Sequence, residues 1–469
     1  MSQQIKLSKC VDINPNNKAL FCIQNKCVNC GMCLNKCKQS AGACGFYDIA
    51  DTKNNHQICI GCGQCILVCP TGALVEKRHW VNSIKDIIDP NKKVVFITAP
   101  ATRVAFGDAF GLPPGQNVES KLVGACRSVG ADYVFDTSTG ADLTVMEEAS
   151  ELVHRLMNNG KLPMFTSCCP AWVKFAETFY PELTDNLSTC KSPIAMMGTL
   201  VKTYFAKKEN LDPNNIVVIS VTPCTAKKFE QDREETWANE VGKNDIDYTI
   251  TVRELAEWVQ AKNITWEMID NSEFDLFLPK GSGAGIIFGN TGGVTEATLR
   301  TAYYLINGVE APSDFYKLEP VRGLTAIKQA EIDLKVKTIN VTVIQGTAIA
   351  RNFFEHLKVN QDQQIDFIEV MACPGGCIAG GGQPKFPAPR MEAVKQARIQ
   401  NLYKADEASE RRCAHKSSVV IDIYNSFLDK PYSEKSEHYL HTKGFIDRSG
   451  DLGNMNVHEL NIKASELAQ

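Results

Sequence analysis

The sequence predicts an α/β catalytic region of two lobes, with mixed, mainly parallel sheets flanked by helices, preceded by a small α+β domain. Two observations predict it. Beyond about residue 90, short β-branched apolar runs alternate with helical patterns, which favours parallel strands joined by crossover helices. Before residue 70 stand eleven of the 19 cysteines. The chain of 469 residues is long enough for two or three domains with real cores.

Composition excludes several function classes. A formal net charge of -4 and a pI near 6.1 argue against general nucleic-acid binding. No apolar run approaches the roughly 20 residues that cross a bilayer, and the first residues lack the features of a signal or transit peptide. We therefore expect a cytoplasmic protein with reduced thiols, which favours metal or redox chemistry over disulfides. Scattered buried thiols are the alternative, but they do not explain the clustering.

Two cysteine runs define the first domain, expected over residues 1–82. CVNCGMCLNKC (27–37) and CIGCGQCILVC (59–69) both follow C-x2-C-x2-C-x3-C, the bacterial ferredoxin spacing. Because the fourth cysteine of each run ligates the other cluster, we predict two 4Fe–4S clusters. The first is assigned Cys27, Cys30, Cys33 and Cys69, and the second Cys37, Cys59, Cys62 and Cys65.

Some details of this domain fit less well. Zinc is the weaker alternative, because its sites use cysteine pairs separated by a longer loop. The first run is followed by Lys38 where the second has Pro70. Three cysteines are left over, for which we expect structural roles: Cys10, Cys22 and Cys44.

The catalytic region is expected over residues 92–395, with the two lobes divided near residue 215. A helix is predicted from residue 142, ending at Gly160. The predicted strands are 93–99, 132–138, 162–167, 215–221, 285–289, 339–346 and 365–371. The glycine-rich stretch 281–293 does not fit G-x-G-x-x-G, because residue 286 is isoleucine, and it predicts close backbone approach to a site.

Five of the eight remaining cysteines follow strands, and the sequence assigns no role to Cys126, Cys190 and Cys413. TSCCPAW (166–172), TPCTAKKFE (222–230) and EVMACPGGCIAGGGQP (369–384) each lie at the end of a predicted strand. In open α/β sheets, sites form outside the carboxyl ends of the strands. We therefore expect convergence of Cys168, Cys169, Cys224, Cys373 and Cys377, beside glycines that let a bulky group approach the main chain.

These three segments, in this order, closely resemble the signature segments of the FeFe hydrogenases. The C-terminal RRCAHKSSVVIDIYNSFLDKPYSEKSEHYLHT resembles the family's small subunit, and we expect a helical segment over 396–445 with a polar tail over 446–469. The resemblance implies an H-cluster, a 4Fe–4S cubane joined to a di-iron subsite that carries CO, cyanide and an amine-bearing dithiolate. Its ligands would be Cys169, Cys224, Cys373 and Cys377, with Cys377 as the bridge.

The resemblance also implies a proton path. Cys168 would face the amine, followed by Glu148, Ser188, Glu151 and Arg155. Glu148, Glu151 and Arg155 fall on one helix face. A solvated acidic face is the usual meaning of that spacing, and Glu147 is the competing position.

The cofactor pocket follows in the same way. Lys227 would donate to a cyanide, and the expected lining is Ala99, Pro100, Ala101, Ser192, Met196, Phe288 and Met371. Two positions depart from the family's common form, Thr222 for methionine and Ile194 for glutamine. They resemble a divergent clostridial subgroup, sometimes called group B, and predict a bias toward H2 oxidation.

The resemblance implies an enzyme that interconverts H2 with protons and electrons, served by hydrogenase maturation proteins and exchanging electrons with a ferredoxin or flavodoxin. A hydrogenase-like iron–sulfur assembly protein is one alternative, but Cys168, Lys227, Glu148 and Ser188 argue against it. A hydrogen sensor is another, but the C-terminal segment is too short for a signalling domain.

Overall fold

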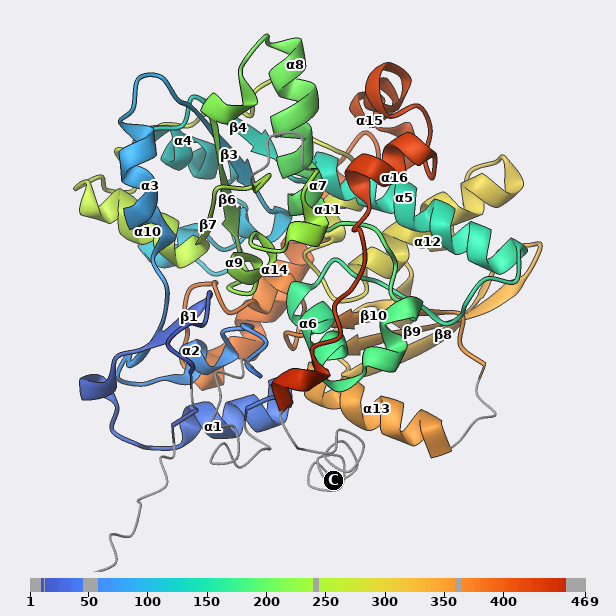
Figure 1. The fold of residues 1–469 in the computed structure, drawn as a ribbon, viewed down its shortest axis with the longest axis horizontal. Coiled ribbons are helices and arrows are strands. Elements are labelled where there is room, and N and C mark those ends of the chain that lie inside the picture. Colours follow the sequence, from blue (N-terminus) through green and yellow to red (C-terminus); the bar gives the residue numbers. More distant parts are fainter. Residues whose placement is uncertain (1–9, 12, 45–57, 239–243, 360–363, 453–469) are drawn as a thin grey trace, which may run out of the picture.

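The computed structural model describes residues 10–11, 13–44, 58–238, 244–359 and 364–452. Two four-stranded sheets form the catalytic region, and the cysteine-rich domain lies below them in Figure 1. No helix among the described residues is both long and apolar enough to span a membrane.

The first sheet is entirely parallel, in the order β4-β3-β6-β7. Its strands are Tyr133–Asp136, Lys93–Thr98, Ile216–Thr222 and Tyr248–Thr251. Because β3 alternates with period two, Val94 and Phe96 pack on one face and Val95 and Ile97 on the other. The first face is covered by α4 (Glu119–Val129) and α10 (Val252–Ala261), with α3 (His79–Ile87) alongside. The second is covered by α5 (Ser138–Met157) and α7 (Pro193–Leu200).

The second sheet is mixed, in the order β5-β10-β9-β8, with β8 antiparallel. Its strands are Met164–Phe165, Phe367–Met371, Thr338–Gln345 and Ile327–Asp333. One face packs on α6 (Pro170–Phe179) and α13 (Thr347–Val359), and the other on α12 (Gly293–Asn307). Both sheets are therefore buried between helices, as the alternating pattern predicts.

The N-terminal domain is small. Antiparallel strands β1 (Leu20–Cys22) and β2 (Leu74–Glu76) accompany α1 (Met32–Lys36) and α2 (Gln64–Val68). Thr347 donates to the carbonyl of Ala41 at 2.7 Å, and Lys174 donates to that of Cys59 at 2.8 Å. These bonds attach the domain to the second sheet's helices.

The C-terminal segment contributes α14 (Ala388–Glu407), α15 (Ser418–Ile423) and α16 (Glu434–Leu440). The last two lie against α5 and α7 (Figure 1). The buried carboxylate of Glu147 on α5 holds them: it accepts from Tyr424 Oη at 2.5 Å and from the Tyr432 amide at 2.8 Å. Residues 446–452 also pack, with Arg448 paired to Glu177 at 2.8 Å.

Two predictions about the chain are wrong. Residues 285–289 are not a strand: Gly283–Ile287 forms helix α11, and a Cβ on Gly285 would lie 2.3 Å from the carbonyl oxygen of Ser138, so glycine permits close packing of α11 on α5. A single boundary near residue 215 does not separate the lobes. β5 precedes that boundary yet pairs with β10, whereas β6 and β7 follow it and belong to the sheet of β3.

Candidate functional site

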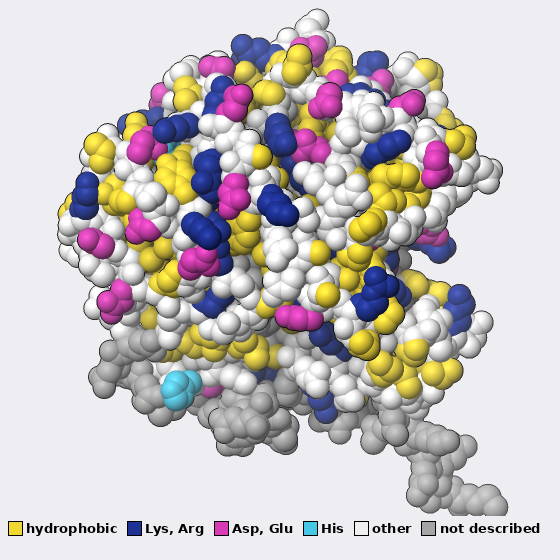
Figure 2. All heavy atoms as spheres, turned by 180° about the vertical axis from the view of Figure 1, so that it is seen from behind, with side chains coloured by type: hydrophobic (Ala, Val, Ile, Leu, Met, Phe, Trp, Pro, Cys, Tyr) yellow, Lys and Arg dark blue, Asp and Glu magenta, His cyan; other side chains and the backbone are white. Residues whose placement is uncertain are grey.

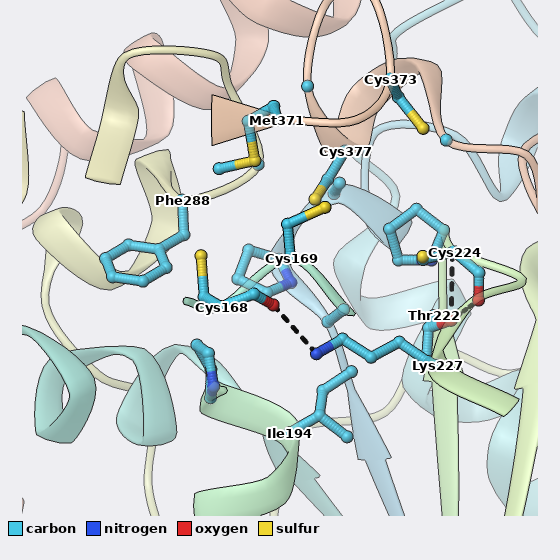
Figure 3. Close-up of a pocket in the computed structure, with 18 of the residues that line it drawn as sticks. Cys168, Cys169, Ile194, Thr222, Cys224, Lys227, Phe288, Met371, Cys373 and Cys377 are labelled. Atoms are coloured by element: carbon cyan, nitrogen blue, oxygen red, sulfur yellow. Dashed lines mark hydrogen bonds between the residues drawn. The ribbon is translucent and has the colours of Figure 1, made fainter. Parts of the chain in front are cut away.

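A cavity lies where the carboxyl ends of strands from both sheets meet. Its volume is about 80 Å³, several times the roughly 10–15 Å³ that one water molecule needs. All five predicted cysteines line it: Cys168, Cys169, Cys224, Cys373 and Cys377 (Figure 3). The prediction that these distant segments converge is therefore correct as geometry.

Three of the thiols are positioned by the ends of strands. Cys169 is the N-cap of α6 just after β5, Cys224 follows the end of β6 at Thr222, and Cys373 follows the end of β10 at Met371. In Figure 3 the sulfurs of Cys169 and Cys377 lie side by side, whereas that of Cys168 lies on the side of Phe288 and Met371. The adjacent thiols of Cys168 and Cys169 therefore serve different parts of the cavity.

The donor set fits an iron–sulfur group. Burial raises the pKa of the Cys224 thiol to about 12 and raises the pKa of Cys373 and Cys377 as well. Such thiols ionise only against a bound cation, which a thiolate-ligated metal supplies.

The glycines of the Cys377 loop permit close packing against neighbouring backbone. A Cβ on Gly376 would lie 2.6 Å from the Thr291 nitrogen, and one on Gly380 would lie 2.2 Å from the Pro223 oxygen. The close approach expected at these glycines is therefore to the chain itself, and it fixes the loop that carries Cys377 at the cavity.

Most of the predicted lining residues reach this cavity, but two do not. Those that do are Ala99, Pro100, Ala101, Ile194, Thr222, Lys227, Phe288 and Met371. Ser192 instead caps α7 and donates to Glu230 Oε2 at 2.9 Å. Met196 points into the core, where its sulfur accepts from Thr144 Oγ1 at 3.3 Å. For these two, the turn of α7 directs the side chain away from the cavity.

Lys227 occupies the cavity wall. Its Nζ donates to the carbonyl of Cys168 at 3.2 Å (Figure 3) and is paired with Glu230 Oε2 at 2.7 Å. The negative Glu230 raises the pKa of Lys227, against the effect of burial. The side chain is thus a charged donor held at the cavity, and Glu230 was not anticipated from the sequence.

The predicted proton path is continuous at its outer end. Ser188 Oγ donates to Glu151 Oε2 at 2.7 Å, and Arg155 Nη2 donates to Glu151 Oε1 at 2.5 Å. All three side chains are at least largely buried, so this is not a solvated helix face.

Glu148 lies nearer the cavity and is fully enclosed. Burial, with Glu151 adding repulsion, raises its pKa well above the usual range. Thr298 donates to Glu148 Oε2 at 3.3 Å, while Oε1 has no hydrogen-bond partner among the described residues. Burial also raises the pKa of Cys168, with Glu148 as the next cause. No hydrogen bond joins Glu148 directly to Cys168 or Ser188 in the part of the chain that the structure describes. Glu147, the competing position, binds the C-terminal segment instead.

The eight predicted ferredoxin-type cysteines form two groups. Cys27, Cys30, Cys33 and Cys69 line one small cavity. Cys10 lines it too, and Cys33 Sγ lies 3.7 Å from Cys10 Sγ. In the other group, burial raises the pKa of Cys65 and Cys62, with smaller contributions from Cys59 and Cys37 at Cys65 and from Cys373 at Cys62. The second group therefore lies between the first and the large cavity.

The junction to the cavity is a contact between glycines. A Cβ on Gly63 would lie 3.1 Å from Cα of Gly381, and one on Gly381 would lie 2.1 Å from the carbonyl oxygen of Cys62. Gln64 donates to the carbonyl of Ala379 at 2.9 Å. No sequence pattern indicates Gln64, because its role appears only when the two loops meet.

Family profiles match most of the chain. The C-terminal domain of the iron only hydrogenase large subunit matches residues 92–381, the iron hydrogenase small subunit matches residues 392–445, and a 4Fe–4S binding domain matches residues 54–75. Iron hydrogenase 1 of Clostridium pasteurianum is 40% identical over 450 residues, spanning 92% of this chain and 76% of that protein.

Two further comparisons bear on function. A solved structure of the [FeFe]-hydrogenase HydA1 of Chlamydomonas reinhardtii, a point variant, aligns with a TM-score of 0.69 and 35% identity, covering 79% of this chain and all of that one. More distantly, the cytosolic iron-sulfur assembly component 3 of Bos taurus is 26% identical over 417 residues, 85% of each chain.

We expect Gly376→Ala to prevent the cavity from holding its iron–sulfur group. The φ of Gly376 is +82°, and the new methyl would meet the backbone at Thr291, so strain and overpacking should cost roughly 2–5 kcal/mol locally. Iron content per chain and the thermal midpoint measure the effect. Gly308→Ala is the matched control, because its φ is also positive, at +67°, but its Cβ would meet nothing within 4 Å. Equal iron content in the two variants would contradict the argument.

Proposed function

Because the chain belongs to the FeFe hydrogenase family, we propose that it interconverts H2 with protons and electrons at this cavity, with a bias toward H2 oxidation. The observation that supports this assignment is the meeting of five cysteines from three segments at one cavity. We propose Cys169, Cys224, Cys373 and Cys377 as the ligands of the H-cluster, with Cys377 as the bridging one. When bound, that group supplies the iron chemistry at which H2 is cleaved.

The wall residues hold and polarise the group. Lys227, kept charged by Glu230, would donate to a cyanide ligand, which is a charge-assisted hydrogen bond. The backbone at Ala99, Pro100 and Ala101 lines the same cavity, as do Phe288 and Met371, which exclude water from it. Hydrogenase maturation proteins would deliver the di-iron part.

Infrared spectroscopy of the anaerobically matured protein tests the assignment. We expect CO and cyanide bands under argon that shift under hydrogen. An assembly protein is the second candidate, favoured by the relative from Bos taurus. Iron–sulfur content without those bands, in a host whose maturases load a control hydrogenase, would establish that candidate instead.

We propose that protons pass between Cys168 and solvent through Glu148, Ser188, Glu151 and Arg155. Burial, with repulsion from Glu151, raises the pKa of Glu148 and so favours its protonated form, which can donate a proton. Its free Oε1 suits a step to Cys168 through water.

Replacing members of the path should slow turnover in both directions. We expect Glu148→Gln, Glu151→Gln and Cys168→Ala each to lose at least about 100-fold in rate, the usual scale for a removed proton carrier. Hydrogen oxidation and evolution assays measure this. Glu147→Gln is the matched control, because this neighbouring buried carboxylate binds the C-terminal segment. Wild-type rates in all three path variants would show that protons take another route.

Electrons would pass from the cavity to the cluster of Cys37, Cys59, Cys62 and Cys65, and then to that of Cys27, Cys30, Cys33 and Cys69. Residues 13–44 and 58–75 contain four lysines and no acidic residue; Lys18 is paired with Asp232 and Lys36 lies near Cys62, whereas Lys26 adjoins Cys27 of the outer cluster. Phe21, Val28 and Met32 are exposed there. In Figure 2, the lobe at lower right has dark blue and yellow side chains without magenta ones. This surface suits an acidic ferredoxin or flavodoxin, in a cytoplasm that keeps thiols reduced.

Charge reversal at this surface should weaken only the binding of the electron-transfer partner. We expect Lys26→Glu to raise the KM for an acidic ferredoxin about threefold to tenfold, roughly 0.7–1.4 kcal/mol, and to leave turnover with a small dye unchanged. Lys207→Glu on α8 (Ala206–Lys208), at the opposite end of the molecule in Figure 1, is the control. Equal effects of the two would point to net charge, not docking.

Thr222 supports the proposed bias. Its Oγ1 donates to the carbonyl of Cys224 at 2.8 Å and accepts from the Cys224 amide at 3.1 Å, and it lines the cavity beside Ile194. A hydroxyl there replaces a polarisable thioether next to a proposed cluster ligand. We expect Thr222→Met to lower the ratio of hydrogen oxidation to evolution, measured by protein-film voltammetry. An unchanged ratio counts against the bias.

A further inference from the structure

We propose that Glu151, Cys190 and His441 form a zinc site that blocks the proton path when it is filled. The carboxylate, thiol and imidazole ligand atoms lie within 4.8 Å of one another, and all three residues are buried. The inference rests on the proposed proton path, because Glu151 is its outer carboxylate.

The distances suit tetrahedral zinc. With Zn–S near 2.3 Å and Zn–N or Zn–O near 2.05 Å, the sulfur lies about 3.6 Å from a nitrogen or oxygen ligand of the same tetrahedral zinc. Cys190 Sγ lies 3.7 Å from Glu151 Oε2 and 4.0 Å from His441 Nε2. These two separations need to change by only a few tenths of an ångström, the Glu151 and His441 atoms lie within 4.8 Å of each other, and water would supply the fourth ligand.

The backbone already fixes two of the ligands opposite each other. Cys190 and His441 form an antiparallel bridge, with Thr442 donating to the Thr189 carbonyl at 2.7 Å and Lys191 to that of Leu440 at 2.8 Å. His441 Nδ1 lies 2.7 Å from Thr189 Oγ1, so Nε2 is the nitrogen that would bind a metal, in place of its present contact with Glu147 Oε2 at 3.1 Å.

The surrounding charge favours a cation. A further carboxylate stands beside the cluster, because Glu147 Oε2 lies 3.1 Å from His441 Nε2. Arg155 opposes this, but it binds Oε1 of Glu151, whereas Oε2 faces Cys190. Zinc binding would release the Cys190 thiol proton to solvent and form a Zn–S bond.

One of the three ligands, His441, borders an open cavity. His441 and Thr189 line an open cavity of about 900 Å³ that Asp429, Glu434 and Glu437 also line. A second Glu–Cys–His cluster, Glu310, Cys413 and His415, is less suitable. Its carboxylate is 40% exposed and already paired with Lys416 at 3.0 Å.

Bound zinc would stop the relay at Glu151. The carboxylate Oε2 that accepts from Ser188 would be occupied by the metal, so it could no longer take a proton. The proposed hydrogenase chemistry in the cavity would remain intact, and only the proton supply would fail.

The first test titrates Zn²⁺ into the holoenzyme during hydrogen oxidation. We expect half-inhibition to require at least tenfold more zinc in Cys190→Ala and in His441→Gln than in the wild type. Cys413→Ala, in the other cluster, should need the same concentration as the wild type. Equal zinc sensitivity in all four proteins would overturn the proposal.

The second test is zinc X-ray absorption on the same holoenzymes, with iron content checked as constant. We expect a sulfur neighbour near 2.3 Å in the wild type and in Cys413→Ala, absent in Cys190→Ala. No zinc–sulfur contact in the wild type would overturn the site. Zinc bound through Cys190 without inhibition would overturn the block and count against Glu151 as a proton carrier, while leaving the hydrogenase assignment untouched.

Discussion

Two sheets must present the ends of their strands to one set of thiols, and this constraint shapes the rest of the molecule. Cys224 follows β6 of the first sheet, and Cys169 and Cys373 follow β5 and β10 of the second. A rigid inorganic group tolerates little error in ligand position, so both sheets are buried between helices that fix them. The glycines of the Cys377 loop then supply the close backbone contacts that side chains would prevent.

Proton and electron transfer leave the cavity through different kinds of contact. The electron side depends on backbone proximity, with Gly63 against Gly381 and Gln64 bridging to Ala379. The proton side depends on buried side chains along α5, where Glu151 is held between Ser188 and Arg155. The same helix also anchors the C-terminal segment through Glu147. Neighbouring carboxylates on α5 therefore have different roles, one in attaching that segment and the others in the proposed proton path.

Features that depend on local residue spacing could be predicted from the sequence. The cysteine runs follow from cluster geometry, and the strand-end cysteines follow from the rule for open α/β sheets. Features whose local pattern is ambiguous could not be predicted: a short apolar run such as 285–289 is compatible with either a strand or a buried helix. The side-chain directions of Ser192 and Met196 depend on how α7 packs. Thr298 and Gln64 gave no signal, because their partners come from other segments of the fold. Glu230 lies only three residues after Lys227, so the i, i+3 spacing of this pair was the signal that could have found it.

The interleaving of the two lobes has a consequence for synthesis on the ribosome. Met164 of β5 pairs with Phe367, about 200 residues later, and α5 waits for the C-terminal segment that binds Glu147. The second sheet cannot form until β10 emerges, whereas the strands of the first sheet all lie within residues 93–251, and pairings as distant as that of β5 with β10 form slowly. The thiols of the cavity therefore stay reactive until nearly the whole polypeptide has been translated, which places metal loading after chain completion and makes protection of the nascent chain from oxidation part of its biogenesis.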